Sequence, residues 1–556
     1  MRIAILLLLN LLYFSTAQAQ AQIIFQNGFE TPSDITANDG EAARFLLQAS
    51  FGPTTAEIAR VRQIGYRAWI DAELAKPASL QKPYLDFIAG IPEPVFQNAR
   101  LEAWYKNTIT GSDQLRQRVA YALSQIFVTS DLNGELNNEV YGMAIYYDLL
   151  ATNAFGRYRD VLENVTLSPI MGSYLSMIAN AKPIVALNIR PDENYAREIM
   201  QLFSIGLIKL NPNGTPQLGG GVPIPTYNNN TIRAFAHVFT GWHFGNCTEF
   251  EFCGPGFPLA IGARIPMRGF ADFHHTEPDA DLLNNTLLDG FARPAGGTPE
   301  ANLDIALDNI ANHPNVGPFI GRRLIQNLVS SNPSPEYIGR ITAVFDNNGS
   351  GVRGDLAAVV KAILLDPEAR SMGGNRGKLR EPILREVALL RTFSGRSADN
   401  RYRLHNPEFP YAQAPGRANS VFNFYQPDYR LPGEITSLNL YSPEFQITTE
   451  TTITTASNEY LVWSFLFHIG AWTNPPADRI FFDLRPAAAL ASNPGTMADY
   501  FSVLLMGGTM SAQMRTVLIN YSNTIPLTAG NDSGGRVRAS EMLNLILTSP
   551  EFSVLK

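Results

Sequence analysis

The chain contains Arg190-Pro-Asp-Glu-Asn-Tyr-Ala-Arg-Glu-Ile-Met-Gln-Leu-Phe-Ser-Ile-Gly-Leu207, which has the pattern of an amphipathic helix, predicted here over 192–207. Its apolar face consists of Tyr195, Ile199, Leu202, Phe203 and Ile205. The opposite stripe, at helical spacing, consists of Asn194, Arg197, Glu198 and Gln201. An acid, a guanidinium and two amides in one line predict either a buried polar network or the wall of a site.

The same helical period recurs along most of the chain. It is clearest at 113–130, where Asp113 stands at the start and an acid suits the helix dipole. Asp355 is expected to cap a helix at 355–365, at the end of a Gly-rich turn. Further helices are predicted at 41–48, 55–62, 66–74, 138–150, 157–166, 170–179, 230–242, 301–312, 316–329, 335–345, 380–394, 455–467, 497–505, 511–523 and 535–547.

Three segments, 211–229, 243–300 and 396–450, are rich in Gly, Pro, Asn or aromatic residues and are predicted to be irregular. Alternation of apolar and polar residues is rare, so we expect no large sheet. The predicted fold is mainly α-helical. It would be one large multi-helix domain with long irregular loops, or two packed helical lobes that meet near 243–300.

The first nineteen residues have the pattern of a secretory signal peptide. Arg2 is followed by an apolar run from Ile3 to Tyr13 and by Ala17-Gln-Ala19, a small-x-small cleavage site. About eleven apolar residues are too few to span a bilayer core of roughly 30 Å, which argues against an uncleaved anchor. We therefore expect a signal peptide at 1–19, a linker at 20–38 and a helical domain at 39–556. The mature protein would be secreted or periplasmic and carry no membrane span.

Composition excludes some partners and indicates one covalent bond. The net charge is −7 and no basic run stands out, so nucleic acid is not an expected partner. Hydrophobic residues make up 45% of the chain, as is usual for a protein with a sizeable core. Cys247 and Cys253 are the two cysteines, and in an oxidising compartment they predict a disulfide that closes a short loop.

Several blocks, in order, resemble a bacterial family known only as domain of unknown function 1800. They are Ala43-Arg-Phe-Leu-Leu-Gln-Ala-Ser-Phe-Gly-Pro53, the helix 114–130, Glu193-Asn-Tyr-Ala-Arg-Glu-Ile-Met-Gln-Leu-Phe-Ser-Ile-Gly206, Arg233-Ala-Phe-Ala-His-Val-Phe-Thr-Gly-Trp242, Lys378-Leu-Arg-Glu-Pro382 and Ser420-Val-Phe-Asn-Phe-Tyr-Gln-Pro-Asp-Tyr429. The family pattern often has a second acid where this chain has Gln201, and a histidine where it has Phe203.

The resemblance implies an exported, largely helical protein without an agreed activity. Genes of that family often lie beside genes of another exported family, domain of unknown function 1501. The second family is similar to the sulfatase and alkaline-phosphatase superfamily. The resemblance therefore implies an exported protein of the unknown-function 1501 family as a partner.

The candidate catalytic residues come from two predicted helices and are Glu198, Arg197, Arg233 and His237. A carboxylate, two guanidinium groups and an imidazole can together line an acid–base site. The alternative is structural: Arg197 pairs with Glu193 four residues earlier, and His237 is an ordinary hydrogen-bonded histidine. The structural interpretation is preferred from sequence alone.

The candidate metal ligands are His274 and His275, in the irregular segment after these helices. With Glu198, Glu277 and Asp279 they offer the imidazole and carboxylate donors that zinc, iron or manganese accepts, so a divalent metal is the cofactor considered. The alternative is a solvated loop, because no compact ligand motif is present.

The sequence contains neither the Gly-x-Ser-x-Gly nucleophile elbow of α/β-hydrolases nor the Gly-x-x-x-x-Gly-Lys-Ser/Thr phosphate-binding loop. The leading hypothesis is a non-catalytic accessory or binding protein of the cell envelope that acts with another exported protein. The alternative hypothesis is a hydrolase, possibly metal-dependent, whose site is lined by the Glu, Arg and His candidates.

Overall fold

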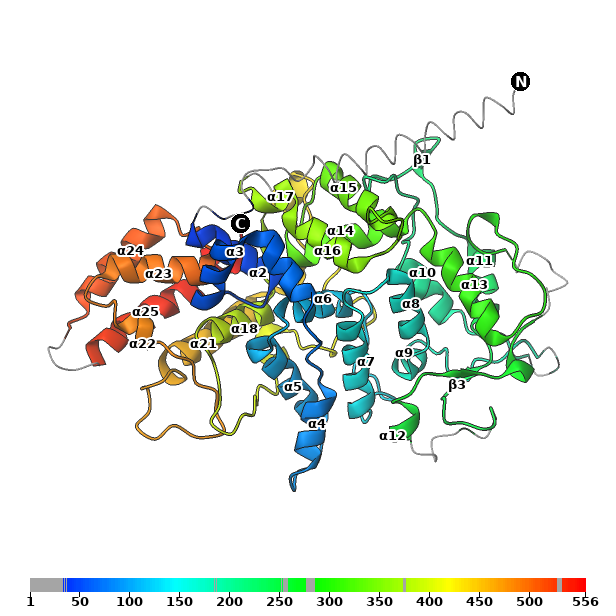
Figure 1. The fold of residues 1–556 in the computed structure, drawn as a ribbon, viewed down its shortest axis with the longest axis horizontal. Helices are drawn as coiled ribbons and strands as arrows, with labels where there is room; N and C mark the ends of the chain where they lie inside the picture. Colours follow the sequence, from blue (N-terminus) through cyan, green and yellow to red (C-terminus); the bar gives the residue numbers. More distant parts are fainter. Residues whose placement is uncertain are drawn as a thin grey trace.

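The computed structural model describes residues 34, 36, 38–184, 186, 188–251, 253, 259–276, 286–373, 377–527 and 533–556. The predicted signal peptide 1–19, most of the linker 20–38, and Glu277 and Asp279 lie outside these residues. The described chain is mainly α-helical with long irregular connections, so the predicted fold class is confirmed (Figure 1). No described helix is long and apolar enough to cross a membrane.

The first part of the chain forms helices that pack around α6 and α7. These are α2 (Asp39–Ala49), α3 (Thr55–Leu74), α4 (Lys82–Ala89), α5 (Gln97–Thr110), α6 (Gln114–Ser124), α7 (Val140–Thr152), α8 (Tyr158–Thr166) and α9 (Pro169–Tyr174). Asn38 and Thr54 cap α2 and α3 by accepting hydrogen bonds from the main-chain N–H groups of Glu41 and Glu57. Figure 1 shows α4 as a projection below α5 and α7.

A second group of helices packs beside α8. It comprises α10 (Asn194–Gln201), α11 (Asn229–Val238), α12 (Leu259–Gly262) and α13 (Pro299–Ala311), with the short 3-10 turns η2 (Ala271–Phe273) and η4 (Leu288–Gly290). α10 contacts α11, and α13 contacts both α8 and α11. α10 and α11 carry the candidates Glu198, Arg197, Arg233 and His237, and His274 and His275 directly follow η2.

The helices that follow cover α6 and α3. They are α14 (Val316–Leu328), α15 (Pro335–Asp346), α16 (Leu356–Leu365) and α17 (Pro367–Arg370). The predicted cap of α16 is confirmed, because Asp355 accepts a hydrogen bond from the N–H of Ala358 at 3.1 Å.

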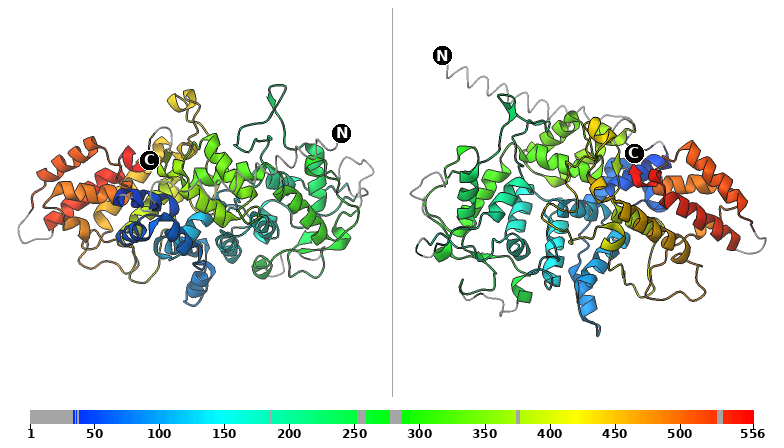
Figure 2. Two further views of the ribbon diagram at one scale, coloured as in Figure 1. Left: turned by 45° about the horizontal axis from the view of Figure 1, so that its top comes forward. Right: turned by 180° about the vertical axis from the view of Figure 1, so that it is seen from behind.

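The last helices run from the middle of the molecule to its other end, with colours from yellow-green to red in Figures 1 and 2. They are α18 (Pro382–Thr392), α19 (Glu408–Tyr411), α20 (Glu434–Ser437), the 3-10 turn η5 (Pro443–Ile447), α21 (Glu450–Leu466), α22 (Arg485–Ala488), α23 (Pro494–Met506), α24 (Ala512–Thr524), α25 (Ser533–Leu547) and α26 (Pro550–Ser553). One cluster of buried apolar side chains extends from Ala42 to Phe552 and joins helices of all the groups.

The described strands are short and pair only as antiparallel ribbons. They are β1 (Leu218–Gly219) with β2 (Val222–Pro223), β3 (Trp242–His243) with β4 (Arg268–Gly269), and β5 (Lys378–Leu379) with β6 (Val554–Leu555). The β5–β6 pair joins the end of the chain to the segment before α18. The expectation of no large sheet is confirmed for the described residues.

Several predicted helices end earlier than expected. The 170–179 helix stops at Tyr174 and the 230–242 helix stops at Val238. The 113–130 helix stops at Ser124, and Ser130 instead forms a bridge with Arg417. The 192–207 helix stops at Gln201, where the N–H groups of Ile205 and Gly206 both donate to the carbonyl of Met200. Gly206 has a φ of 71°, a conformation that glycine accepts without strain and that ends a helix.

Candidate functional site

Glu198 on α10 is buried, and its Oε2 has no hydrogen-bond partner among the described residues. Burial raises the pKa of this carboxyl, and the positive charge of Arg197 opposes the effect. Burial also raises the pKa of Tyr227 to about 12; the charge of Arg197 lowers it and the charge of Glu198 raises it by smaller amounts. These three groups therefore lie near one another, and a carboxyl of raised pKa is suited to proton transfer.

Arg197 and Arg233 do not point to Glu198 but converge on Glu193 at the start of α10. Arg197 Nη2 lies 3.4 Å from Glu193 Oε2, and Arg233 Nε lies 3.7 Å from Glu193 Oε1. All three side chains are partly or well exposed to solvent, so the ion pairs are screened and each contributes at most about 1 kcal/mol. The structure thus separates the two predicted guanidinium groups into a surface cluster.

His237 on α11 and His275, which follows η2, are brought together. Their ring centroids lie 4.3 Å apart and both side chains are buried. The main-chain N–H of His275 donates to Thr240 Oγ1 at 2.9 Å, which fixes its loop against the end of α11. The hydrolase hypothesis placed both residues at one site, but their spacing in the sequence did not predict that the two rings touch.

His274 is enclosed in a hydrogen-bonded structure of its own. Its Nδ1 lies 2.9 Å from the carbonyl of Thr240 and therefore donates, while Nε2 lies 2.8 Å from Asn302 Nδ2 and accepts. Burial lowers the pKa of this imidazole, which keeps it neutral. With both ring nitrogens engaged, His274 in this arrangement does not fit the role of a metal ligand.

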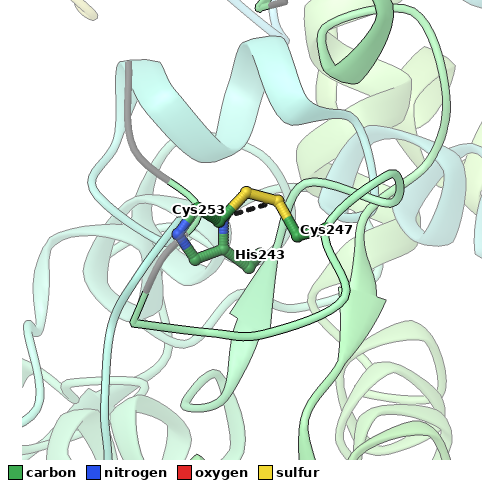
Figure 3. Close-up of side chains that lie close together, drawn as sticks. All are labelled: His243, Cys247 and Cys253. Atoms are coloured by element: carbon green, nitrogen blue, oxygen red, sulfur yellow. Dashed lines mark hydrogen bonds between the residues drawn. A yellow bond between two sulfur atoms is a disulfide. The ribbon is translucent and has the colours of Figure 1, made fainter. Parts of the chain in front are cut away.

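Cys247 and Cys253 form the predicted disulfide, with their Cα atoms 5.6 Å apart. Figure 3 shows His243 beside it, with Nδ1 3.9 Å from Cys247 Sγ. The same Nδ1 accepts a hydrogen bond from the N–H of Phe244 at 2.9 Å. These three side chains have the types and spacing of metal ligands, but a sulfur in a disulfide is not a thiolate and does not hold a metal as one does.

Residues 44–554 match the model of a family described as a protein of unknown function, DUF1800. The chain belongs to the DUF1800 family. No curated protein matches this chain, and no solved structure does. Within this DUF1800 protein, the resemblance inferred from ordered sequence blocks is therefore confirmed over nearly the whole chain.

Sequence reasoning missed a set of buried acids at the centre of this DUF1800 protein. Glu381 precedes α18 and accepts hydrogen bonds from Tyr121 (2.6 Å) and from Gln413 Nε2 (2.6 Å). Glu386, one turn further on, accepts from Tyr105 at 2.9 Å. The block Lys378-Leu-Arg-Glu-Pro382 was the available signal, but nothing in its spacing shows that the acid is buried.

Proposed function

We propose that this protein is an exported, envelope-associated binding protein that acts with another exported protein, and that it is an accessory factor and not the catalyst. Signal-peptide cleavage near Ala19 would release it to the periplasm or the exterior. The observation that carries the proposal is a projecting arm made by residues 207–227. The pairing of Arg197 and Arg233 with Glu193 at the surface also supports it.

The arm is an ordered ribbon with apolar side chains in solvent. It contains β1 and β2, and it projects from the body in each view of Figures 1 and 2. Main-chain hydrogen bonds hold its base, including Lys209 N–H to the carbonyl of Ile224 and Thr226 N–H to the carbonyl of Leu207. Leu218 is 60% exposed and Val222 is 66% exposed.

Exposed apolar side chains on a well-hydrogen-bonded ribbon are suited to binding a protein surface. Burying one such side chain stabilises a complex by about 1.5–3 kcal/mol, and an ordered backbone reduces the entropy cost of binding. The family's gene neighbourhood makes an exported protein of the unknown-function 1501 family the partner we propose.

The test is binding of the mature protein to such a purified 1501-family protein. We expect the double variant Leu218→Ser/Val222→Ser to bind at least about tenfold more weakly. The matched control is Val517→Ser/Val537→Ser, which removes two exposed valines at the other end of the molecule. Equal binding by the arm variant and the wild type, or no binding by the wild type, would contradict the proposal.

A hydrolase is the second candidate, and Glu198 is the observation that favours it. A buried carboxyl of raised pKa next to Tyr227 has the properties of a general acid or base. The candidate predicts that Glu198→Gln and His237→Ala both leave the protein folded and abolish a measured hydrolysis. If both variants merely lower the melting temperature, these side chains stabilise the fold and the hydrolase is excluded.

A further inference from the structure

A cavity of about 520 Å³ opens between the start of α5, the loop before α7 and the segment around Arg417. Its volume is in the range of small-molecule binding sites. None of the residues proposed above as catalytic or metal-binding lines it. Its polar and aromatic lining includes Phe96, Gln97, Asn98, Asp131, Asn137 and Arg417.

Asp131 is a fixed hydrogen-bond acceptor in this cavity. It is only 3% exposed, and both Arg100 Nη2 (2.8 Å) and Arg417 Nε (3.1 Å) donate to the same oxygen, Oδ2. No described residue donates to Oδ1, and this oxygen is not fully enclosed by protein. Because Asp131 lines the cavity, Oδ1 is held ready to accept a hydrogen bond from a ligand.

The other walls offer an aromatic surface and further polar groups. Phe96 is 63% exposed, so one side of its ring is open to a ligand. Asn98, Asn137 and Asn138 add side-chain amides, which both donate and accept. α5 and α7 both start at this cavity, and at neither start does a capping side chain accept from the first main-chain N–H groups.

The charges around the cavity balance. Arg100 and Arg417 share Asp131, and Arg417 Nη1 also lies 3.0 Å from Glu408 Oε1. Two guanidinium groups therefore meet two carboxylates, and these four groups carry no net charge between them. The cavity favours a neutral ligand that has many hydroxyl groups and an apolar face.

We propose that this cavity binds a saccharide, with a sugar ring stacked on Phe96 and a hydroxyl group donating to Asp131 Oδ1. Sugar rings present C–H groups on one face and hydroxyl groups at the edge, which matches an aromatic ring surrounded by amides and a carboxylate. This inference concerns a different surface from the 207–227 arm and does not depend on the proposed function.

The experiment is isothermal titration of the full mature protein with neutral oligosaccharides built from glucose and from N-acetylglucosamine. Removing Asp131 would leave the buried Arg100 guanidinium unpaired, so the variants are at exposed positions. We expect Phe96→Ala to weaken binding about tenfold, and Asn137→Ala/Asn138→Ala to weaken it severalfold. The matched control is Phe409→Ala, which removes another exposed aromatic ring (78% exposed) outside the cavity and should bind as the wild type does.

Three results would overturn the proposal. The first is no heat of binding with any of these sugars at millimolar concentration. The second is sugar binding that Phe96→Ala leaves unchanged, which would place the sugar elsewhere. The third is binding of inorganic phosphate that Phe96→Ala leaves unchanged and that displaces the sugar, which would make the cavity an anion site.

Discussion

Replacing Glu386 by glutamine should remove a loss of stability that the wild-type protein shows as the pH rises from about 4.5 to 7. The Glu386 carboxyl is buried on α18 and accepts hydrogen bonds from Tyr105 (2.9 Å), Tyr411 (3.1 Å) and Trp463 Nε1 (3.2 Å). Burial raises its pKa from 4.5 to about 7, and the negative charge of Glu459 adds to this effect. The three donors oppose the shift without cancelling it.

The folded protein binds this proton more tightly than the unfolded chain does. The stability that protonated Glu386 contributes is therefore fully present below about pH 4.5 and is lost as the pH rises through about 7. A tenfold difference in proton affinity corresponds to about 1.4 kcal/mol, so the full loss is about 3 kcal/mol. That is a large fraction of the 5–15 kcal/mol by which most proteins are stable.

Urea unfolding of wild-type protein and Glu386→Gln at about pH 5 and about pH 7.5 measures this loss. Other buried acids contribute equally to both proteins, so the difference between the two pH dependences belongs to Glu386. Glu459→Gln is the control. Removing that negative charge should lower the pKa of Glu386, so this variant should lose the same stability at a lower pH than the wild type does. Parallel pH dependences for wild type and Glu386→Gln would refute the reasoning.

Three further predictions concern local features. Asp355 caps α16, so Asp355→Ala should lower the free energy of unfolding, measured in urea, by about 1 kcal/mol. Asp355→Asn should lower it by less, because asparagine also caps helices. Equal losses would mean that the cap is not the cause. Gly52→Ala should destabilise the protein by about 1–3 kcal/mol in thermal unfolding, because Gly52 has a φ of 145° and a new Cβ would lie 2.9 Å from Ala388 Cα. Gly134→Ala is the control: its new Cβ would meet nothing within 4 Å, so its stability should be unchanged. Cys247→Ser/Cys253→Ser should cost about 2 kcal/mol and make the intervening loop more sensitive to protease, and a reductant should do the same to the wild type but leave the variant unchanged.

The amphipathic helices were predictable because each buries one face and shows the other to water. α5 was not predicted, and its surroundings give the reason. It is buried on nearly all sides, and its charged residues Arg100 and Glu102 are inside the protein, paired with Asp131 and Arg401. Periodicity cannot reveal a helix whose polar residues are neutralised by partners from distant parts of the chain.

Helix ends were harder to predict than helix positions for a similar reason. Ile126 stays buried although α6 ends at Ser124, because the chain that follows turns and packs in the core. Apolar spacing therefore continued past the true end of the helix. Tertiary pairing, such as Ser130 with Arg417, decides the boundary and leaves no local signal.

The candidate site was predicted only in part. The sequence identified a stripe with Glu198 and Arg197, and the structure buries the first and leaves the second partly exposed. It could not show that Arg197 and Arg233 share Glu193, or that His237 meets His275. Those contacts depend on how α10, α11 and the later loop pack, and long-range packing is not written in the spacing of residues.

α2, the first described helix, packs against α23 near the other end of the chain, and this arrangement affects how the protein folds. Gly40 of α2 lies against Gly507 and Gly508, directly after α23, and strand β5 waits for β6 at the end of the chain. During synthesis from the N-terminus, the apolar side of α2 stays exposed to water until α23 has been made. Contacts between residues so far apart in the sequence slow folding and prolong the time for which apolar surface is exposed. We therefore expect the unfinished chain to aggregate more readily than that of a protein of the same size built from local contacts.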